Sequence, residues 1–186
     1  MRVENPPLLI LAISGSLRRG SSNTAVLRAA GELAPAGVEI ALYDAMASLP
    51  AFNPDLDDNP PPAAAEFRAA LQAADGVLIS SPEYAHGVSG MLKNALDWVV
   101  GSSELVDKPV ALINASPRAT IAQAALCETL TTMSAALVSE ASIALPLLGR
   151  VLPPGGIAAD PEIAGPLRVA VQALASAIQA RRAGVT

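Results

Sequence analysis

The sequence predicts an α/β domain, in which a doubly wound, five-stranded parallel sheet carries helices on both faces in three layers. Two observations lead to this prediction. Short apolar runs of strand length alternate five times with segments of helical periodicity, and such alternation is typical of parallel sheets. The 186 residues are 52% hydrophobic and 16% charged, without a break in composition. We therefore expect a single domain over 1–186 rather than a disordered chain.

Strands are expected where a continuous apolar run meets a polar or glycine-containing segment. The run 8–13 (LLILAI) stops at Ser14 and Gly15, and its lack of alternation indicates a strand that is buried on both faces. The remaining strand candidates are 38–42, 76–80, 109–114 and 138–145. The last of these is the weakest, because alanine and serine dilute its apolar residues.

Helices are expected where apolar residues recur every three or four positions. Such segments are 24–34, 63–74, 89–100, 120–137 and 167–182. Pro35 ends the first helix and Pro62 suits the start of the second. Arg181 and Arg182 suit the end of the last helix, where the helix dipole favours cations. The proline-rich segments between these elements are predicted to be long loops, at 49–62 and 147–161.

Composition excludes several classes of function. Twelve basic and 17 acidic residues give a net charge of −5, so we expect the protein to bind neither nucleic acid nor an anionic lipid surface.

The apolar run 8–13 is too short for a membrane span or a signal-peptide core, and a cytoplasmic location is expected. A single cysteine, Cys127, and a single histidine, His86, exclude an intrachain disulfide and thiolate- or histidine-rich metal sites. We expect no metal, and we expect Cys127 to be structural.

The segment 14–23 (SGSLRRGSSN) joins the first strand to the first helix and is rich in hydrogen-bond donors. Hydroxyl and amide side chains lie close to Arg18 and to the N-terminus of the following helix, where free N–H groups and the helix dipole favour anions. This arrangement predicts a phosphate-monoester site. The simpler alternative is a strand–helix turn in which serine and asparagine serve only as caps.

Three common motifs are missing from this loop. The spacing from Gly15 resembles a nucleotide-binding P-loop, but Ser21 stands where its lysine is required. The sequence contains neither a G-x-G-x-x-G dinucleotide loop nor the G-x-S-x-G elbow of hydrolases. Nucleoside triphosphate hydrolysis, dinucleotide binding of that type and serine hydrolysis are therefore not supported.

The segment 81–90, which follows the third strand, gathers aromatic and titratable side chains. Tyr84 is suited to covering the edge of a flat aromatic ligand, and backbone groups of a stiff 82–84 turn could meet its ring heteroatoms. A solvated position is favoured for His86 over a role as a base. Trp98 has the spacing of a core residue, and Lys93 with Asp97 has the spacing of a helix-surface pair.

Together, the two segments resemble one known family. G-S-L-R-x-x-S-x-N at 15–23 looks like one signature of the NADPH-dependent FMN reductase family, and P-E-Y at 82–84 with L-K-N-A-L-D-W at 92–98 looks like another. The resemblance implies a flavodoxin-like fold, bound FMN and NAD(P)H as substrate. It also implies a small-molecule electron acceptor and assembly as a homodimer or homotetramer. Two departures are Ser89, where proline is usual, and a 115–120 loop that lacks the family's glycine pair.

The resemblance also implies roles for individual residues. Ser16, Arg18, Ser21 and Asn23 would hold the FMN phosphate, with Leu17 and Ser22 beside them. The isoalloxazine ring would lie along Pro82, Glu83, Tyr84 and Ala85, with Ser116 near its far edge. These residues make up the predicted cofactor site: Ser16, Leu17, Arg18, Ser21, Ser22, Asn23, Pro82, Glu83, Tyr84, Ala85 and Ser116.

The implied reaction needs no catalytic protein residue, because the flavin carries the hydride chemistry at N5. Electrons would pass from NAD(P)H to free flavin, a quinone or a similar small acceptor by a ping-pong mechanism. Two alternatives remain open. One is a flavodoxin-like electron carrier, which Arg18 disfavours since such carriers usually hold the phosphate without arginine. The other is a non-catalytic module that keeps the fold without FMN.

Overall fold

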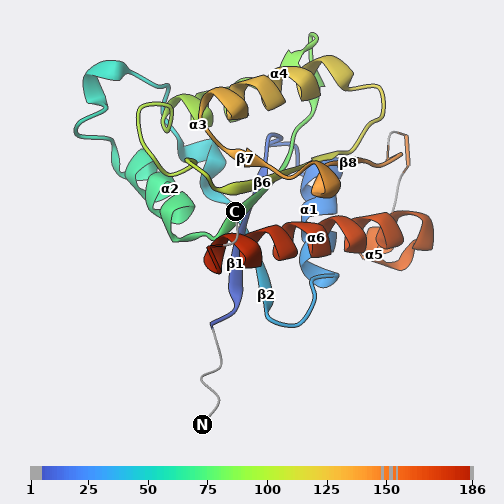
Figure 1. Cartoon of the computed structure of the whole chain (residues 1–186). Helices are drawn as coiled ribbons and strands as arrows, with labels where there is room; N and C mark the ends of the chain where they lie inside the picture. Colours follow the sequence, from blue (N-terminus) through green and yellow to red (C-terminus); the bar gives the residue numbers. More distant parts are fainter. Residues whose placement is uncertain (1–5, 148, 151–152, 154, 185–186) are drawn as a thin grey trace.

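The computed structural model describes residues 6–147, 149–150, 153 and 155–184. A six-stranded, all-parallel sheet forms its centre (Figure 1). Its strands are β1 (Leu8–Ser14), β2 (Val38–Leu42), β3 (Gly76–Ser80), β6 (Pro109–Asn114), β7 (Ala136–Leu137) and β8 (Ile143–Ala144). The order β2-β1-β3-β6-β7, with β8 also paired to β6, is that of flavodoxin-like folds. The predicted fold class is confirmed.

Helices cover both faces of this sheet (Figure 1). On one face lie α1 (Ser22–Glu32), α5 (Gly156–Ala159) and α6 (Pro161–Arg182). On the other lie α2 (Pro62–Ala73), α3 (Gly90–Asp97) and α4 (Thr120–Thr132). Successive residues of β1 point to opposite faces, so Ile10 and Ala12 join the first core, and Leu11 and Ile13 join the second.

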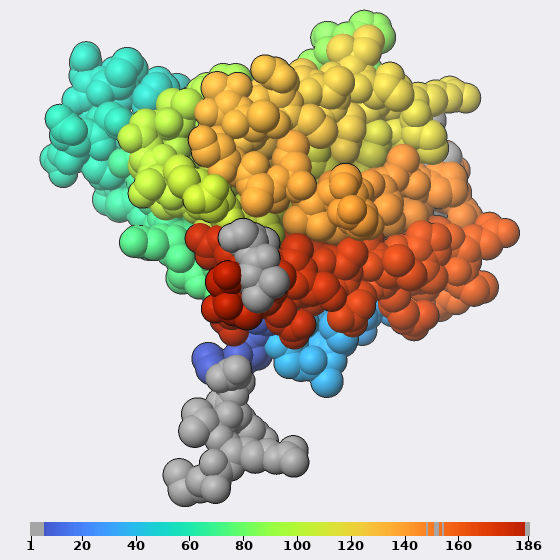
Figure 2. All heavy atoms as spheres, viewed as in Figure 1, coloured from blue at the N-terminus to red at the C-terminus, as the bar shows by residue number. Residues whose placement is uncertain are grey.

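The order in which strands are added reverses between β1 and β3, because β2 lies on one side of β1 and β3, β6 and β7 lie on the other. Because β1 leads to α1 on one face and β3 leads to α3 on the other, the loops that follow these strands diverge. Their carboxyl ends therefore frame a crevice at a topological switch point, which is where ligands bind in open α/β sheets. In the space-filling view, the 134–147 segment, which contains β7 and β8, lies between α4 and α6 at one side edge of the sheet (Figure 2).

The predicted strand at 138–145 is wrong. Two short strands, β7 and β8, stand in its place and are separated by the 3-10 helix η3 (Ser139–Ala141). The Ser142 hydroxyl explains the interruption, since it accepts a hydrogen bond from Leu112 N at 3.1 Å and donates one to Val138 O at 2.9 Å. A side chain thus replaces the backbone ladder between the two strands.

Helix α4 ends five residues before the predicted limit of 137. Ser134 adopts a left-handed conformation with φ of 58°, and Ala135 N donates to Leu130 O at 3.0 Å. Ser134 N also donates to Thr131 O at 2.9 Å. These two bonds form a Schellman motif. Serine stands in the position that glycine usually takes, so no glycine marks the end of this helix in the sequence.

Helix α6 begins at Pro161, six residues before the expected start. The Asp160 carboxylate caps it by accepting from Glu162 N at 3.0 Å, and Pro161 occupies the first turn, where its missing N–H costs nothing. Two apolar residues of this added segment, Ile163 and Ala164, are fully buried. The helix contains Pro166, one residue before the expected start at Leu167.

The other differences are smaller. Helix α1 starts two residues early, α3 starts at Gly90 and ends at Asp97, and α2 matches within one residue. One 3-10 helix, η1 (Ala45–Ser48), precedes the long 49–62 loop, and another, η2 (Pro54–Leu56), lies within it. The 81–88 loop contains a hairpin of two short strands, β4 (Glu83–Tyr84) and β5 (Gly87–Val88). The tip of this hairpin projects beyond α4 (Figure 2).

Candidate functional site

The loop after β1 is held by hydrogen bonds to the neighbouring strand and within itself. Gly15 N donates to Ser80 O of β3 at 2.8 Å, and the Ser14 and Thr24 hydroxyl oxygens lie 2.8 Å apart. Ser16 N donates to Ser14 Oγ at 3.3 Å. These contacts fix the start of the loop against the sheet, so its middle, from Leu17 to Gly20, is the exposed part.

Helix α1 points its N-terminus into the cavity at this loop. Ser21 is the N-cap and accepts from Thr24 N at 3.4 Å, and the first intrahelical bond runs from Ala25 N to Ser21 O at 2.9 Å. The N–H groups of Ser22 and Asn23 precede that bond, so the helix itself offers them no carbonyl. An anion at this point gains both donors and the positive end of the helix dipole.

A buried contact joins this helix to the central sheet. Ser80 Oγ, at the end of β3, lies 2.9 Å from Asn23 Oδ1 and 2.7 Å from Ile113 O of β6. Both Asn23 and Ser80 are buried. Ser80 therefore positions the start of α1 relative to two strands, a role that the sequence did not reveal.

The hairpin after β3 presents Tyr84 to solvent and to the cavity, and the Tyr84 side chain is 57% exposed. Its two turn residues, Ala85 and His86, both have positive φ, 49° and 59°. His86 is solvated at the tip, as expected, but a carboxylate does lie beside it, because Glu83 Oε1 is 3.2 Å from His86 Nδ1. The other carboxylate oxygen of Glu83 accepts from Ala122 N of α4 at 2.8 Å.

The loop after β6 is organised by Asn114, a buried residue that sequence reasoning missed. Its amide nitrogen donates to Ala119 O at 2.9 Å, and its amide oxygen accepts from Ser116 N at 2.9 Å. Ser116 Oγ in turn accepts from Arg118 N at 3.4 Å. In this loop, which lacks the glycine pair, the side chains of Asn114 and Ser116 hold the backbone in place.

These loops surround one cavity of about 1000 Å³. Nine of the eleven predicted site residues line it: Ser16, Arg18, Ser21, Ser22, Asn23, Pro82, Glu83, Tyr84 and Ser116. Leu17 and Ala85 do not line it, and both side chains are exposed. Residues after β8 and on α5 add an apolar wall that was not predicted, including Leu147 and Ile157.

The cavity is electropositive although the chain carries a net charge of −5. Its lining contains two glutamates, Glu32 and Glu83, against five arginines: Arg18, Arg19, Arg28, Arg118 and Arg150. Arg150 is paired with Asp160 at 2.7 Å. A cleft whose lining carries mostly one sign of charge concentrates ligands of the opposite charge. The site therefore suits an anion that carries more than one negative charge.

The second motif, at 92–98, serves the fold rather than the cavity. Asn94 accepts from Phe52 N at 2.8 Å and donates to Pro50 O at 2.9 Å. Trp98 Nε1 also donates to Pro50 O at 2.9 Å, and its side chain is fully buried, as predicted. Together they fasten the long 49–62 loop to α3.

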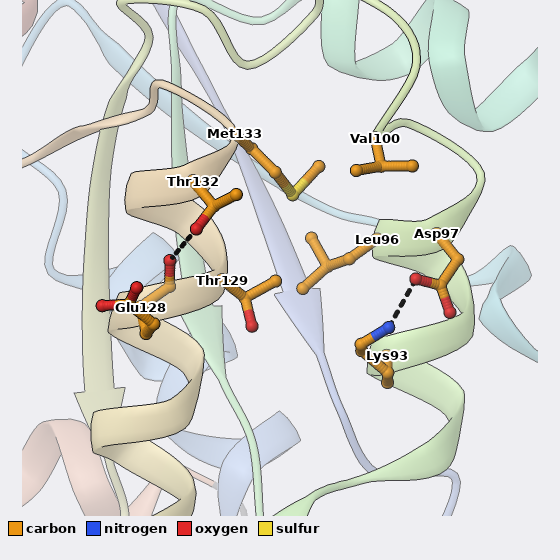
Figure 3. Close-up of a pocket in the computed structure, with 8 residues that line it drawn as sticks. All are labelled: Lys93, Leu96, Asp97, Val100, Glu128, Thr129, Thr132 and Met133. Atoms are coloured by element: carbon orange, nitrogen blue, oxygen red, sulfur yellow. Dashed lines mark hydrogen bonds and ion pairs between the residues drawn. The ribbon is translucent and has the colours of Figure 1, made fainter.

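A smaller hollow of about 210 Å³ lies between α3 and α4 (Figure 3). Leu96 and Met133 point into it, and Lys93 is paired with Asp97 at 2.5 Å, as predicted for this helix surface. Glu128 and Thr132 line the α4 side. It lacks convergent donors, so it does not resemble a cofactor site.

No helix in the described part of the chain has the length and hydropathy needed to cross a bilayer. Over the same residues, no cluster of three or more histidine, cysteine or carboxylate side chains is placed to hold a metal ion.

Comparison with known proteins decides the family. The sequence profile of the NADPH-dependent FMN reductases matches residues 8–147. The chain belongs to the NADPH-dependent FMN reductase family. A NAD(P)H-dependent FMN reductase of Pseudomonas aeruginosa is 43% identical over 110 residues, which is 58% of this chain and 59% of that protein. A quinone reductase of Escherichia coli is 40% identical over 106 residues, 56% of this chain and 55% of the relative.

The chain thus spans less than two thirds of the length of these curated reductases. The similarity to solved structures covers more of the chain than these sequence matches do. FerB, a flavoenzyme NAD(P)H:(acceptor) oxidoreductase from Paracoccus denitrificans, superposes with a TM-score of 0.79 at 28% identity. That match covers 92% of this chain and 97% of FerB.

The residues present fit the cofactor that the family implies. FMN has a phosphate monoester at one end and a flat ring at the other. The cavity is lined by a helix N-terminus, serine hydroxyls and Arg18, which suit the phosphate, and by the Pro82–Tyr84 and 115–119 loops, which suit the edges of the ring. At Gly15 the backbone of the loop after β1 lies close to Ser81, since a Cβ at this position would be 2.3 Å from Ser81 Oγ.

Proposed function

We propose that this chain is an FMN-dependent NAD(P)H oxidoreductase that reduces a small acceptor such as a quinone or free flavin. One observation carries the proposal: the helix-terminus anion site and the two ring-edge loops line the same cavity. Family membership and the names of the relatives support it. When bound, FMN supplies a site that takes hydride from NAD(P)H and passes electrons to the acceptor.

We assign the protein residues to binding and orientation. Ser16, Arg18, Ser21 and the N–H groups of Ser22 and Asn23 hold the phosphate, with Leu17 beside them. Pro82, Glu83 and Tyr84 form one ring-edge wall, with Ala85 beside them at the hairpin turn, and Ser116 belongs to the second ring-edge loop. Asn114 and Ser80 act through these residues, since each fixes a loop or helix that lines the cavity.

Steady-state kinetics test the proposed reaction. Initial rates against NADPH and NADH, at several concentrations of a water-soluble benzoquinone, should give parallel double-reciprocal lines for a ping-pong mechanism. A protein that binds FMN yet consumes no NAD(P)H with any acceptor would instead be a flavodoxin-like carrier. A protein that binds no flavin would be a non-catalytic module.

We also propose that copies of this chain assemble as a homodimer or homotetramer. Large apolar side chains are exposed on the α3–α4 side, including Val100 and Ile121, and the α3–α4 hollow lies on the same side (Figure 3). Light scattering on the eluting protein measures the state directly. A cytoplasmic location and a single cooperative domain stay predictions, which cell fractionation and calorimetry test.

A further inference from the structure

Helix α4 begins without a cap of its own. Its N-cap residue, Ala119, has no side chain that can accept a hydrogen bond, and the first turn contains no acidic residue. The first N–H groups of a helix need such an acceptor, and a negative charge beside them is stabilising. The start of α4 therefore depends on a group from elsewhere in the chain.

Glu83 supplies that group from a different loop. Its Oε2 accepts from Ala122 N at 2.8 Å, across 39 residues of sequence. Ala122 is buried, whereas the Glu83 side chain is 14% exposed. The bond with Ala122 is the main cause that lowers the pKa of Glu83, so the carboxylate is charged at neutral pH and the bond is charge-assisted.

The same carboxylate also spans the hairpin turn. Glu83 Oε1 lies 3.2 Å from His86 Nδ1. Ala85 and His86 both occupy the left-handed region, the geometry of a type I′ turn, which normally selects asparagine and glycine. Non-glycine residues are disfavoured there, so the hairpin needs outside contacts to keep this shape.

The two ends of this link belong to two segments that line the cavity. Pro82 and Tyr84 come from the loop after β3, and Ser116, Arg118 and Ala119 come from the loop after β6. Figure 1 shows the hairpin beside the first turn of α4. A single carboxylate thus joins the wall that follows β3 to the helix that follows the 115–119 loop.

We propose that Glu83 is a positioning residue, whose carboxylate sets the width of the ring end of the cavity by clamping the 81–88 hairpin to the N-terminus of α4. The consequence for flavin binding rests on the proposed function. Since Glu83 acts on the ring end and not on the phosphate end, its loss should weaken FMN and riboflavin binding by the same factor.

A series of variants tests the clamp. Glu83→Ala removes both links, Glu83→Gln keeps an oxygen that can accept from Ala122 N, and His86→Ala removes only the link across the turn. Glu128→Ala is the matched control, because it deletes the same charge from an exposed position on α4 outside the cavity.

Two measurements are made on each variant: amide hydrogen exchange over 119–125 in the flavin-free protein, and the Kd of FMN and of riboflavin. In Glu83→Ala, exchange at Ala122 should accelerate, and both Kd values should rise by about the same factor, on the order of tenfold for one charge-assisted hydrogen bond. In Glu83→Gln, the exchange rate at Ala122 and both Kd values should return most of the way to those of the wild type. The control should match the wild type.

Each contrary outcome has a distinct meaning. If the wild type binds FMN and Glu83→Ala binds both flavins equally well, the positioning role is wrong. Faster exchange without a change in Kd also overturns it, because the clamp would then cap α4 alone. A rise in Kd for FMN only would show that Glu83 affects the phosphate end of the site and not the ring end, and would overturn it. If the wild type binds neither flavin, the proposed function fails and this inference fails with it.

Discussion

Gly15 lies so close to Ser81 that a methyl group on its Cα would sit 2.3 Å from Ser81 Oγ and 2.8 Å from Ser81 Cβ. The two residues belong to the loops after β1 and β3, which contribute to the two ends of the proposed flavin site. Glycine at position 15 is what lets these loops meet.

Gly15→Ala should therefore destabilise the protein. Ser81 Cβ belongs to the loop itself rather than to the end of a flexible side chain, so the loop must shift, at a cost typical of overpacking, about 1–3 kcal/mol. The free energy of unfolding in urea measures this. Gly90→Ala is the matched control, because nothing lies within 4 Å of a Cβ at Gly90; equal stability of the two variants would show that the close approach is harmless.

Arg18→Ala should weaken binding of FMN more than binding of riboflavin. Arg18 lines the cavity beside the N-terminus of α1, and a lost charge-assisted hydrogen bond to phosphate costs about 1.5–3 kcal/mol, or roughly 10- to 100-fold in Kd. Arg18 is exposed, so the lower end of that range is expected. Titration of both flavins measures the difference, with Arg168→Ala on α6 as the control. Equal losses for the two flavins would place Arg18 away from the phosphate.

Cys127→Ala should leave turnover unchanged. Cys127 is half-buried on α4, packs against the core on that face, and has its pKa raised by burial, so little thiolate exists at neutral pH. The expected loss is confined to packing, about 1 kcal/mol, and slow reaction with iodoacetamide would agree with it. A folded variant that still binds flavin but has lost most of its activity would refute a structural role.

Stability should depend on pH through Glu83. The hydrogen bond from Ala122 lowers the pKa of Glu83 below its ordinary 4.5, so the native state binds this proton more weakly than the unfolded state does. The stabilisation is present above pH 4.5 and is lost as the pH falls through the lowered native value. The stability difference between the wild type and Glu83→Gln should therefore shrink on acidification below pH 4.5. A constant difference would show that the charge is not involved.

The parts of the fold that the sequence predicted well are those with strong local signals. The continuous apolar runs of β1, β3 and β6 belong to buried parallel strands, and their limits agree with the structure within one residue. The donor-rich 14–23 loop and the P-E-Y segment were also found from sequence, because each motif follows a strand and identifies its loop directly.

The parts that were missed depend on contacts distant in sequence or on unusual residues. Ser134 ends α4 in a position where glycine is the usual signal, and Ala85 with His86 forms a turn without asparagine or glycine. Lys108 is buried and donates to Ala74 O at 2.6 Å, and also to Leu71 O, which satisfies the end of α2 from outside it. Contacts such as these, and the one between Glu83 and Ala122, join residues that no local pattern connects.

The central claim is that the cavity holds FMN and lets NAD(P)H reduce it. The direct measurement is the visible spectrum of the purified protein, reconstituted with FMN and then mixed with NADPH in the absence of oxygen. The account predicts stoichiometric FMN binding, followed by bleaching of the yellow band with consumption of one NADPH per bound FMN. A protein that binds no FMN, or whose yellow band persists when NADPH or NADH is added, would contradict the account.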